Sequence, residues 1–336
     1  MTDRRTVLEG GTRRRRGHRA PLLALAIVVL VAAALLWLMT SKASGPTIVH
    51  RAGVRHAPAH ASHEVAIEQA PVAPPTYGTL LAPPSERVDV RLKLPLTAGM
   101  LFDVRTGAVL WQREPDRALE IASLTKMMTA LLVVAHSRPS DRVLITSAAT
   151  HFSGSGVGLL PQGKRVPLLA LLYGLLLPSG NDAAIALAQH VAGTQNRFVA
   201  MMNARARELG LRCTRFASTS GIVDQGNHSC AAELAFIAHL VLENPLLGRI
   251  VASQSAVVPF PIKGGKLYLY NNNPLLRVGY PGTDGVKTGF TDAAGHCLVA
   301  AARRGRAWLG VVLLHSADTL DQAQTLLNAG FAKLHS

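Results

Sequence analysis

The sequence predicts an α+β fold, in which one antiparallel sheet is closed by the N- and C-terminal segments of the folded region and joined to a mostly helical subdomain. Strand patterns occur near both ends of that region and helical patterns lie between them. The chain has 336 residues, of which 49% are hydrophobic and 16% charged, so it can bury a sizeable core.

Each element has a local signal. Strands are predicted over residues 98–103, 108–113, 297–303 and 308–314. Helices are predicted over 124–136, 168–176, 182–191, 195–209 and 319–333. Arg105-Thr106-Gly107 and Arg304-Gly305 turn the two hairpins, Pro178-Ser179-Gly180 separates two helices, and Gly210 ends a third.

Four regions are expected along the chain. Residues 1–20 form a basic cytoplasmic tail, 21–39 a transmembrane signal-anchor, 40–84 a disordered linker rich in Ala and Pro, and 85–336 the catalytic domain. Pro21 to Met39 carries no charge and would span about 28 Å as a helix, close to the hydrocarbon thickness of a bilayer.

The arginines before this span place the N-terminus in the cytoplasm. We therefore expect a single-pass protein of the cell membrane with its catalytic domain outside the cytoplasm. A cleaved signal peptide is the rival interpretation, although Ser41-Lys42-Ala43 is a poor cleavage site.

The formal net charge is +15; arginines crowd the tail, and the remaining basic residues are spread thinly with no aromatic residues interleaved. No nucleic-acid partner is expected, because no base-stacking or groove-reading motif accompanies the charge. The histidines of the linker have no surroundings that would fix their geometry, so no metal site is predicted there.

Three cysteines, Cys213, Cys230 and Cys297, allow at most one disulfide and leave one free thiol. Cys297 stands in an apolar run and is interpreted as a core residue.

The first candidate motif is Ser123-Leu124-Thr125-Lys126. Residues three apart share one face of a helix, so Lys126 would lie beside Ser123. A serine hydroxyl needs a base, and a lysine can serve where burial or a neighbouring cation lowers its pKa. Alone, this spacing arises frequently by chance.

The second motif is Ser179-Gly180-Asn181, in a break between two helices. It could aim a hydroxyl and an amide into a cleft, although taken alone it is explained better by helix capping.

The third motif is Lys287-Thr288-Gly289, in a pattern that suits a strand. Lys287 and Thr288 could bind an anionic substrate end, and Gly289 would allow close backbone approach.

Together the motifs resemble the penicillin-binding, active-site-serine superfamily, with its serine–lysine helix, Ser-x-Asn loop and Lys-Thr-Gly strand. Residues 121–129, 173–184 and 284–291 are similar to the corresponding segments of its low-molecular-mass D-Ala-D-Ala carboxypeptidases, peptidase family S11. The resemblance runs from about Leu94 to the C-terminus. It implies a β-lactamase/transpeptidase-like fold without the C-terminal domain that many members carry.

The resemblance also implies roles. Ser123 would be the nucleophile, Lys126 its general base and Ser179 a proton relay. Substrate would be bound by Asn181, Lys287, Thr288, Gly289 and Phe290, with the backbone N–H groups of Ser123 and Phe290 as the oxyanion hole. Two departures stand out: Leu314-His315-Ser316-Ala317 lacks an arginine that some relatives use to hold substrate, and the side chain of Phe290 could narrow the cleft.

The implied activity is removal of the terminal D-Ala from peptidoglycan stem peptides through an acyl-enzyme, with β-lactam antibiotics as inhibitors and no cofactor. A DD-endopeptidase would use the same residues. A β-lactamase would need a glutamate that activates water; Glu208, Glu233 and Glu243 lie in the right interval but in helical stretches. A non-catalytic penicillin sensor is the third alternative.

Overall fold

The computed structural model describes residues 85–158 and 160–334, which lie within one compact unit, Gln69–Ser336. The predicted basic tail, membrane anchor and linker lie outside the described residues. Among the described helices, none is by itself long and apolar enough to cross a membrane. Two of them, α7 (Ala231–Glu243) and α8 (Pro245–Ala252), reach that length and composition only as a pair bent by 101°.

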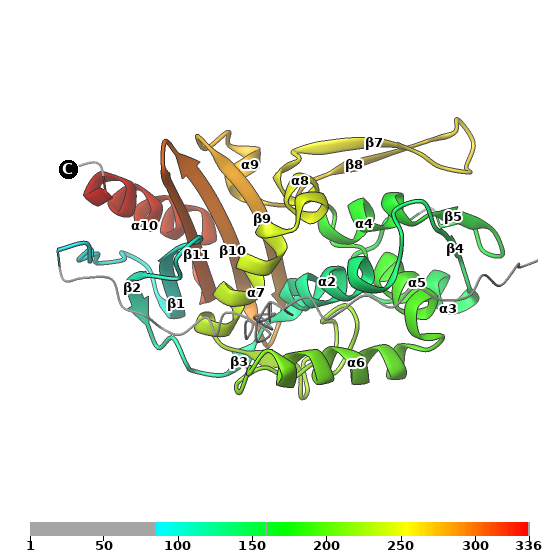
Figure 1. Ribbon diagram of the computed structural model, residues 1–336, viewed down its shortest axis with the longest axis horizontal. Helices are drawn as coiled ribbons and strands as arrows, with labels where there is room; N and C mark the ends of the chain where they lie inside the picture. The colour runs from blue at the N-terminus through cyan, green and yellow to red at the C-terminus, as the bar shows by residue number, and fades with distance from the viewer. Residues whose placement is uncertain (1–84, 159, 335–336) are drawn as a thin grey trace, which may run out of the picture. The chain divides into compact units, whose positions relative to one another are not determined.

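Five strands form one antiparallel sheet in the order β2-β1-β11-β10-β9 (Figure 1). Their bounds are β1 Leu96–Asp103, β2 Val109–Arg113, β9 Thr283–Thr291, β10 Gly295–Arg304 and β11 Ala307–Ser316. The first strand pairs with the last, with Ala98 opposite Leu314. The predicted α+β fold, with a sheet closed by both terminal segments, is therefore confirmed.

Helices cover both faces of this sheet. The final helix, α10 (Thr319–Leu334), packs on one face and buries Leu326, Leu327 and Phe331 against it. α7 contacts the strands from the other face, where the larger core continues into the helical region. Because β10 and β11 are covered on both sides, they are unbroken apolar runs instead of alternating strands.

The helical region is built around α2 (Lys126–His136), which contacts α4 (Leu168–Leu176), α5 (Asn181–Ala192), α6 (Gln195–Glu208) and α7 (Figure 1). The predicted helices agree with the observed bounds within one residue, except that α2 begins two residues later than predicted. There the chain first forms a 3-10 turn, η1 (Ala122–Thr125). Ala122 has a φ of 45° and its carbonyl packs against Gly221, so a distant segment shapes this turn.

The remaining elements are short. They are β3 Leu119–Glu120, β4 Arg142–Leu144, α3 Ser147–Thr150, β5 Arg165–Pro167, β6 His228–Ser229, β7 Ser255–Pro259, β8 Lys266–Tyr270 and α9 Pro274–Arg277. The sequence patterns did not indicate the hairpin of β7 and β8, nor α9.

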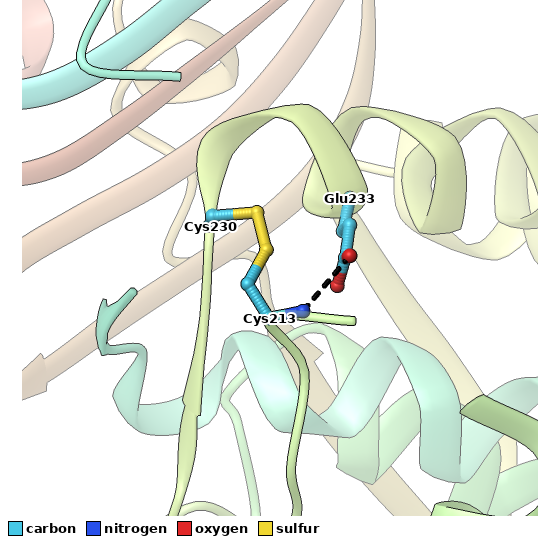
Figure 2. Close-up of side chains that lie close together, drawn as sticks. All are labelled: Cys213, Cys230 and Glu233. Atoms are coloured by element: carbon cyan, nitrogen blue, oxygen red, sulfur yellow. Dashed lines mark hydrogen bonds between the residues drawn. A yellow bond between two sulfur atoms is a disulfide. The ribbon is translucent and has the colours of Figure 1, made fainter. Parts of the chain in front are cut away.

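A disulfide joins Cys213 to Cys230 (Figure 2). Cys297 is a free thiol that is only 1% exposed. This agrees with the limit of at most one disulfide, and the interpretation of Cys297 as a core residue is confirmed. Burial raises the pKa of the Cys297 thiol to about 12, so this cysteine is a core residue and not a reactive one.

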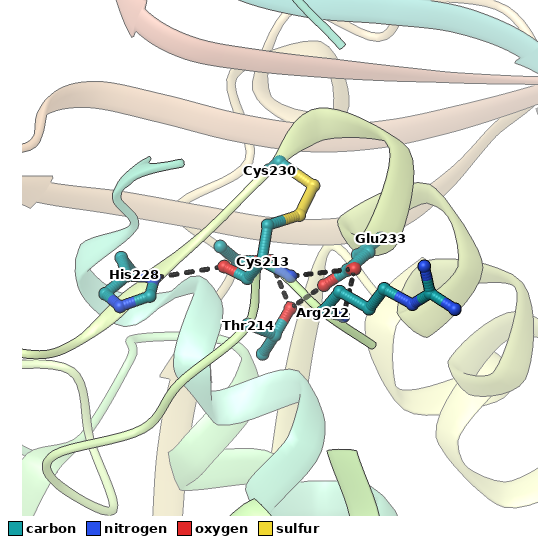
Figure 3. The surroundings of a disulfide bond; sticks show 7 residues. Arg212, Cys213, Thr214, His228, Cys230 and Glu233 are labelled. Atoms are coloured by element: carbon teal, nitrogen blue, oxygen red, sulfur yellow. Dashed lines mark hydrogen bonds between the residues drawn. A yellow bond between two sulfur atoms is a disulfide. The ribbon is translucent and has the colours of Figure 1, made fainter. Parts of the chain in front are cut away.

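Glu233, in the first turn of α7, lies beside the disulfide (Figure 2). Its carboxylate accepts hydrogen bonds from the backbone N–H groups of Arg212 and Cys213 and from the hydroxyl of Thr214 (Figure 3). Although two cysteines and a carboxylate meet here, the sulfurs are bonded to each other and the carboxylate is hydrogen-bonded. The cluster therefore fastens a loop instead of offering metal ligands.

The disulfide closes the segment 214–229, here called the clamp loop. Its contacts reach η1 and β9: the side chain of Asn227 donates to Thr125 Oγ1 at 3.0 Å, and Thr291 Oγ1 in β9 donates to Asp224 Oδ1 at 2.7 Å. A cross-link at the base of this loop therefore restrains the contact between η1 and β9.

Replacing both cysteines, Cys213→Ser with Cys230→Ser, should lower the free energy of unfolding by about 3 kcal/mol, because the loop-closure entropy of the unfolded chain is restored. Urea unfolding with and without dithiothreitol measures this. The reductant should bring the wild-type protein to the level of the variant and leave the variant unchanged. An equal free energy of unfolding for the wild-type protein and the variant, both measured without dithiothreitol, would contradict the expectation.

Candidate active site

Ser123 and Lys126 lie side by side, as the spacing of the first motif predicts. Ser123 is half-buried in η1, and Lys126 begins α2 one turn later. The distance from Lys126 Nζ to Ser123 Oγ is 2.8 Å. This separation suits direct proton transfer between the hydroxyl and the amine.

The amine of Lys126 is fully buried and contacts neutral oxygens only. It donates to Ser123 Oγ, to Asn181 Oδ1 at 2.7 Å and to the backbone carbonyl of Ser220 at 2.8 Å. Burial and, second, the charge of Lys287 hold the pKa of Lys126 well below its ordinary value, while Asp182 opposes them. The site therefore favours the neutral amine, whose lone pair can accept the hydroxyl proton of Ser123.

Ser220 is a contributor that the sequence patterns did not reveal, because it acts through its backbone. The preceding residue of the clamp loop, Thr219, accepts a hydrogen bond from Thr129 of α2 at 2.7 Å through its carbonyl. The next residue, Gly221, has a φ of +81° and packs so closely that a Cβ would lie 1.8 Å from the Ala122 carbonyl oxygen. The clamp loop thus holds the Ser220 carbonyl that accepts a hydrogen bond from Lys126.

The second motif lies across from the first. Ser179 has a φ of 69° and Asn181 begins α5. The side chain of Asn181 does not cap the helix: its oxygen accepts from Lys126, and its amide donates to the Ser153 carbonyl at 2.6 Å. The capping alternative for this residue is therefore wrong.

Asp182 holds the loop that follows Ser153. Its carboxylate accepts from the backbone N–H groups of Val157 at 2.9 Å and Gly158 at 3.0 Å. This loop contributes Ser155 to the wall of the pocket beside Ser123. Asp182 is 1% exposed and was not predicted as part of the site.

The third motif lies in β9 at the edge of the sheet, against η1. A Cβ on Gly289 would lie 3.0 Å from the Ile121 carbonyl oxygen and 3.2 Å from the backbone nitrogen of Ser123. The lack of a side chain at residue 289 therefore lets β9 approach the nucleophile. The backbone amide of Phe290 follows directly along the same strand.

Lys287 is 1% exposed and donates to the Thr288 carbonyl at 2.8 Å. Burial lowers the pKa of Lys287 to about 7. Its positive charge is therefore only partial near neutral pH while the site is empty. An anion bound nearby would favour the protonated form and raise this pKa.

A pocket of about 410 Å³ opens beside Ser123. It brings together members of all three motifs, Ser123, Ser179, Thr288 and Gly289, along with side chains from other segments. Phe290 is 55% exposed in its wall, and its ring lies 4.6 Å from that of His296. A larger groove of about 680 Å³ and a smaller one of about 310 Å³ lie elsewhere on the helical region, and their linings include none of the motif residues.

Known proteins share this sequence pattern and this fold. Residues 91–318 match the model of the peptidase S11 family, described as D-alanyl-D-alanine carboxypeptidase. The D-alanyl-D-alanine carboxypeptidase DacF of Bacillus subtilis is 34% identical over 62% of this chain and 54% of its own length. The chain thus spans about half the length of that relative.

Two further comparisons carry different activity names. A D-alanyl-D-alanine endopeptidase of Pseudomonas aeruginosa is 33% identical over 69% of this chain and 75% of its own length. The crystal structure of the Streptomyces K15 DD-transpeptidase superposes with a TM-score of 0.68 at 32% identity, covering 73% of this chain and all of that one.

Lys287→Gln should move the rising limb of the pH–acylation profile to higher pH. The charge of Lys287 helps to lower the pKa of Lys126, so its removal raises that pKa and leaves less neutral base at a given pH. We expect about a tenfold slower acylation by a labelled penicillin at pH 7. Lys287→Arg, which keeps a cation, is the control and should leave the rising limb of the pH profile near its wild-type position. If the rising limb does not move in Lys287→Gln, the charge of Lys287 does not influence the pKa of Lys126 as described.

Gly221→Ala should displace the clamp loop from Lys126, because the added Cβ meets the Ala122 carbonyl oxygen. Gly226→Ala is a matched control: it lies in the same loop with a φ of +75°, and its Cβ would meet only Arg215 Nε, at 4.0 Å. The control should lose about 1 kcal/mol of stability from its backbone conformation alone. Gly221→Ala should lose more and should slow acylation about tenfold, and equal behaviour of the two variants would refute the role of this contact.

Proposed function

The chain belongs to the peptidase S11 family of D-alanyl-D-alanine carboxypeptidases, and we propose that it removes the terminal D-Ala from peptidoglycan stem peptides by serine acylation. The observation that carries the proposal is the buried amine of Lys126, 2.8 Å from Ser123 Oγ and surrounded by neutral acceptors.

In the acylation step, Lys126 Nζ takes the hydroxyl proton of Ser123, and Oγ attacks the carbonyl carbon between the two D-Ala residues. The backbone N–H groups of Ser123 and Phe290 stabilise the oxyanion. The C–N bond then breaks, and the proton on Lys126 passes through the hydroxyl of Ser179 to the leaving nitrogen. D-Ala departs with a neutral amine, and the shortened peptide remains as an ester on Ser123.

Hydrolysis of the ester repeats the same proton transfers, with water as the attacking group. Lys126 accepts a proton from the attacking water, and the proton returns to Ser123 Oγ as the C–O bond breaks. The amine of Lys126 therefore serves both half-reactions and ends each cycle neutral.

Substrate is held on both sides of this centre. Asn181 uses one amide proton for the Ser153 carbonyl, which leaves the second for a substrate carbonyl. Lys287 and Thr288 hold the terminal carboxylate, or that of a penicillin, and Gly289 lets the peptide backbone approach β9.

Endopeptidase activity on cross-links is the second candidate, because one relative carries that name and the acylation chemistry is shared. A β-lactamase is disfavoured by the positions of the three candidate glutamates. Glu208 pairs with Arg205 at the surface, Glu233 is occupied beside the disulfide and Glu243 is exposed at the end of α7. None of them lines the described pocket.

We further propose that residues 21–39 anchor the protein in the cell membrane and that the catalytic domain acts outside the cytoplasm. The support is the uncharged apolar run, the arginines before it and a substrate class that lies in the cell wall.

Incubation of the full-length protein with benzylpenicillin should add the mass of one inhibitor, and incubation with a D-Ala-D-Ala peptide should release free D-Ala. Ser123→Ala should lose both activities by a factor of about 1,000 or more and keep its circular dichroism spectrum. Intact-protein mass spectrometry and an assay of D-Ala measure these results. A transient adduct without D-Ala release would indicate a β-lactamase, and no adduct would indicate a non-catalytic module.

Muropeptide digestion separates the two peptidase candidates. Loss of a single D-Ala from monomers supports the carboxypeptidase, whereas conversion of cross-linked dimers to monomers supports the endopeptidase.

A further inference from the structure

We infer that Arg277 is a second carboxylate-binding residue of the pocket, which grips the free C-terminus of the substrate from α9 together with Lys287 and Thr288. The inference rests on the proposed function, because it concerns how that function's substrate is selected. Arg277 belongs to none of the three motifs, and it reaches the pocket from the segment between β8 and β9.

The charge of the pocket wall is the first argument. Of the described residues that line the pocket beside Ser123, Arg277 is the only one with a permanently charged side chain. The described part of the chain shows no carboxylate paired with it, and the residue is exposed. A guanidinium without an internal partner in a pocket wall is available to an anionic ligand.

The second argument is that Lys287 by itself does not supply a full positive charge for a bound carboxylate. It is buried, its ammonium already donates to the Thr288 carbonyl, and its pKa of about 7 leaves it only partly charged in the empty pocket. A substrate carboxylate loses hydration on entering the pocket and needs a charged partner. Arginine remains charged and can bind a carboxylate through two parallel hydrogen bonds.

The third argument is that α9 is held firmly in place. Three consecutive asparagines tie it to its surroundings. Asn271 donates to the Val251 carbonyl at 3.1 Å, Asn272 donates to the Pro178 carbonyl at 3.2 Å, and Asn273 accepts from the Leu275 N–H at 2.9 Å.

These contacts place α9 beside the second motif. The backbone N–H of Asn272 also donates to the Leu177 carbonyl, two residues before Ser179. Leu275 is fully buried in the core under α10. The stem of Arg277 therefore starts from a fixed position next to Ser179 and Thr288, which reduces the entropy lost when the guanidinium binds.

The test uses the full-length protein and two substrates, a blocked tripeptide ending in D-Ala-D-Ala and the same tripeptide with a C-terminal carboxamide. In Arg277→Leu, kcat/KM for the acid should fall about 10- to 100-fold, mostly through KM, because binding of the carboxylate is lost. The slow reaction of the amide should change less than twofold. Arg277→Lys should keep an intermediate kcat/KM for the acid.

Arg249→Leu is the matched control, since Arg249 is also exposed near a helix end but lines a different groove. It should leave both substrates unaffected. An unchanged kcat/KM for the acid in Arg277→Leu would overturn the inference. So would an equal loss on acid and amide, which would indicate a general disturbance of the pocket.

A second measurement separates this inference from the proposed function. The acylation rates by benzylpenicillin and by its methyl ester do not depend on peptide hydrolysis. Arg277→Leu should slow acylation by the acid and not by the ester. If the wild-type protein releases no D-Ala and this difference persists, the carboxypeptidase proposal fails while the assignment of Arg277 holds.

Discussion

The burial of the Lys126 amine next to Ser123 is the constraint on which the rest of the site depends. An ammonium in a water-excluded position with no carboxylate partner is unfavourable, so the neutral form is favoured. The groups that contact the amine are consistent with this requirement, and the charge of Asp182 opposes it only in part. Asn181 and the Ser220 carbonyl accept hydrogen bonds without adding negative charge, and Lys287 adds a second cation. The surrounding protein thereby favours the neutral form of this lysine, which is the form that can accept a proton.

The clamp loop connects the segment of η1 and α2 to β9, which is distant from it in the sequence. It contacts α2 through Thr219, η1 through Gly221 and β9 through Asp224, and the disulfide between Cys213 and Cys230 closes it. The loop has little secondary structure, so its position depends on these contacts and on the cross-link. The geometry of the nucleophile is therefore partly a property of residues far away in the sequence.

The two ends of the proposed reaction make different demands on the protein. Proton transfer needs a dry and neutral environment, which the interior around Lys126 supplies. Recognition of a carboxylate needs positive charge close by. Placing all of that charge in the interior would be unfavourable, because each buried cation loses its hydration. The protein separates the two cations by environment, since Lys287 is buried and only partly charged, whereas Arg277 is exposed and permanently charged. The bulky Phe290 lies on the pocket wall against His296.

Much of the structure could be predicted from the sequence because its determinants are local. The helices and hairpins follow from the hydrophobic period and the turn residues, and the proximity of Ser123 to Lys126 follows from a spacing of less than one helical turn. The arrangement of both terminal segments in one sheet follows from the order of these elements. Only the tertiary structure decided that Asn181 faces Lys126, that the carbonyl of Ser220 completes the contacts of the amine, that Cys213 pairs with Cys230, and that Arg277 reaches the pocket. A backbone carbonyl has no residue identity to detect, and a contact between residues far apart in the sequence depends on how helices and strands pack, which no local pattern records.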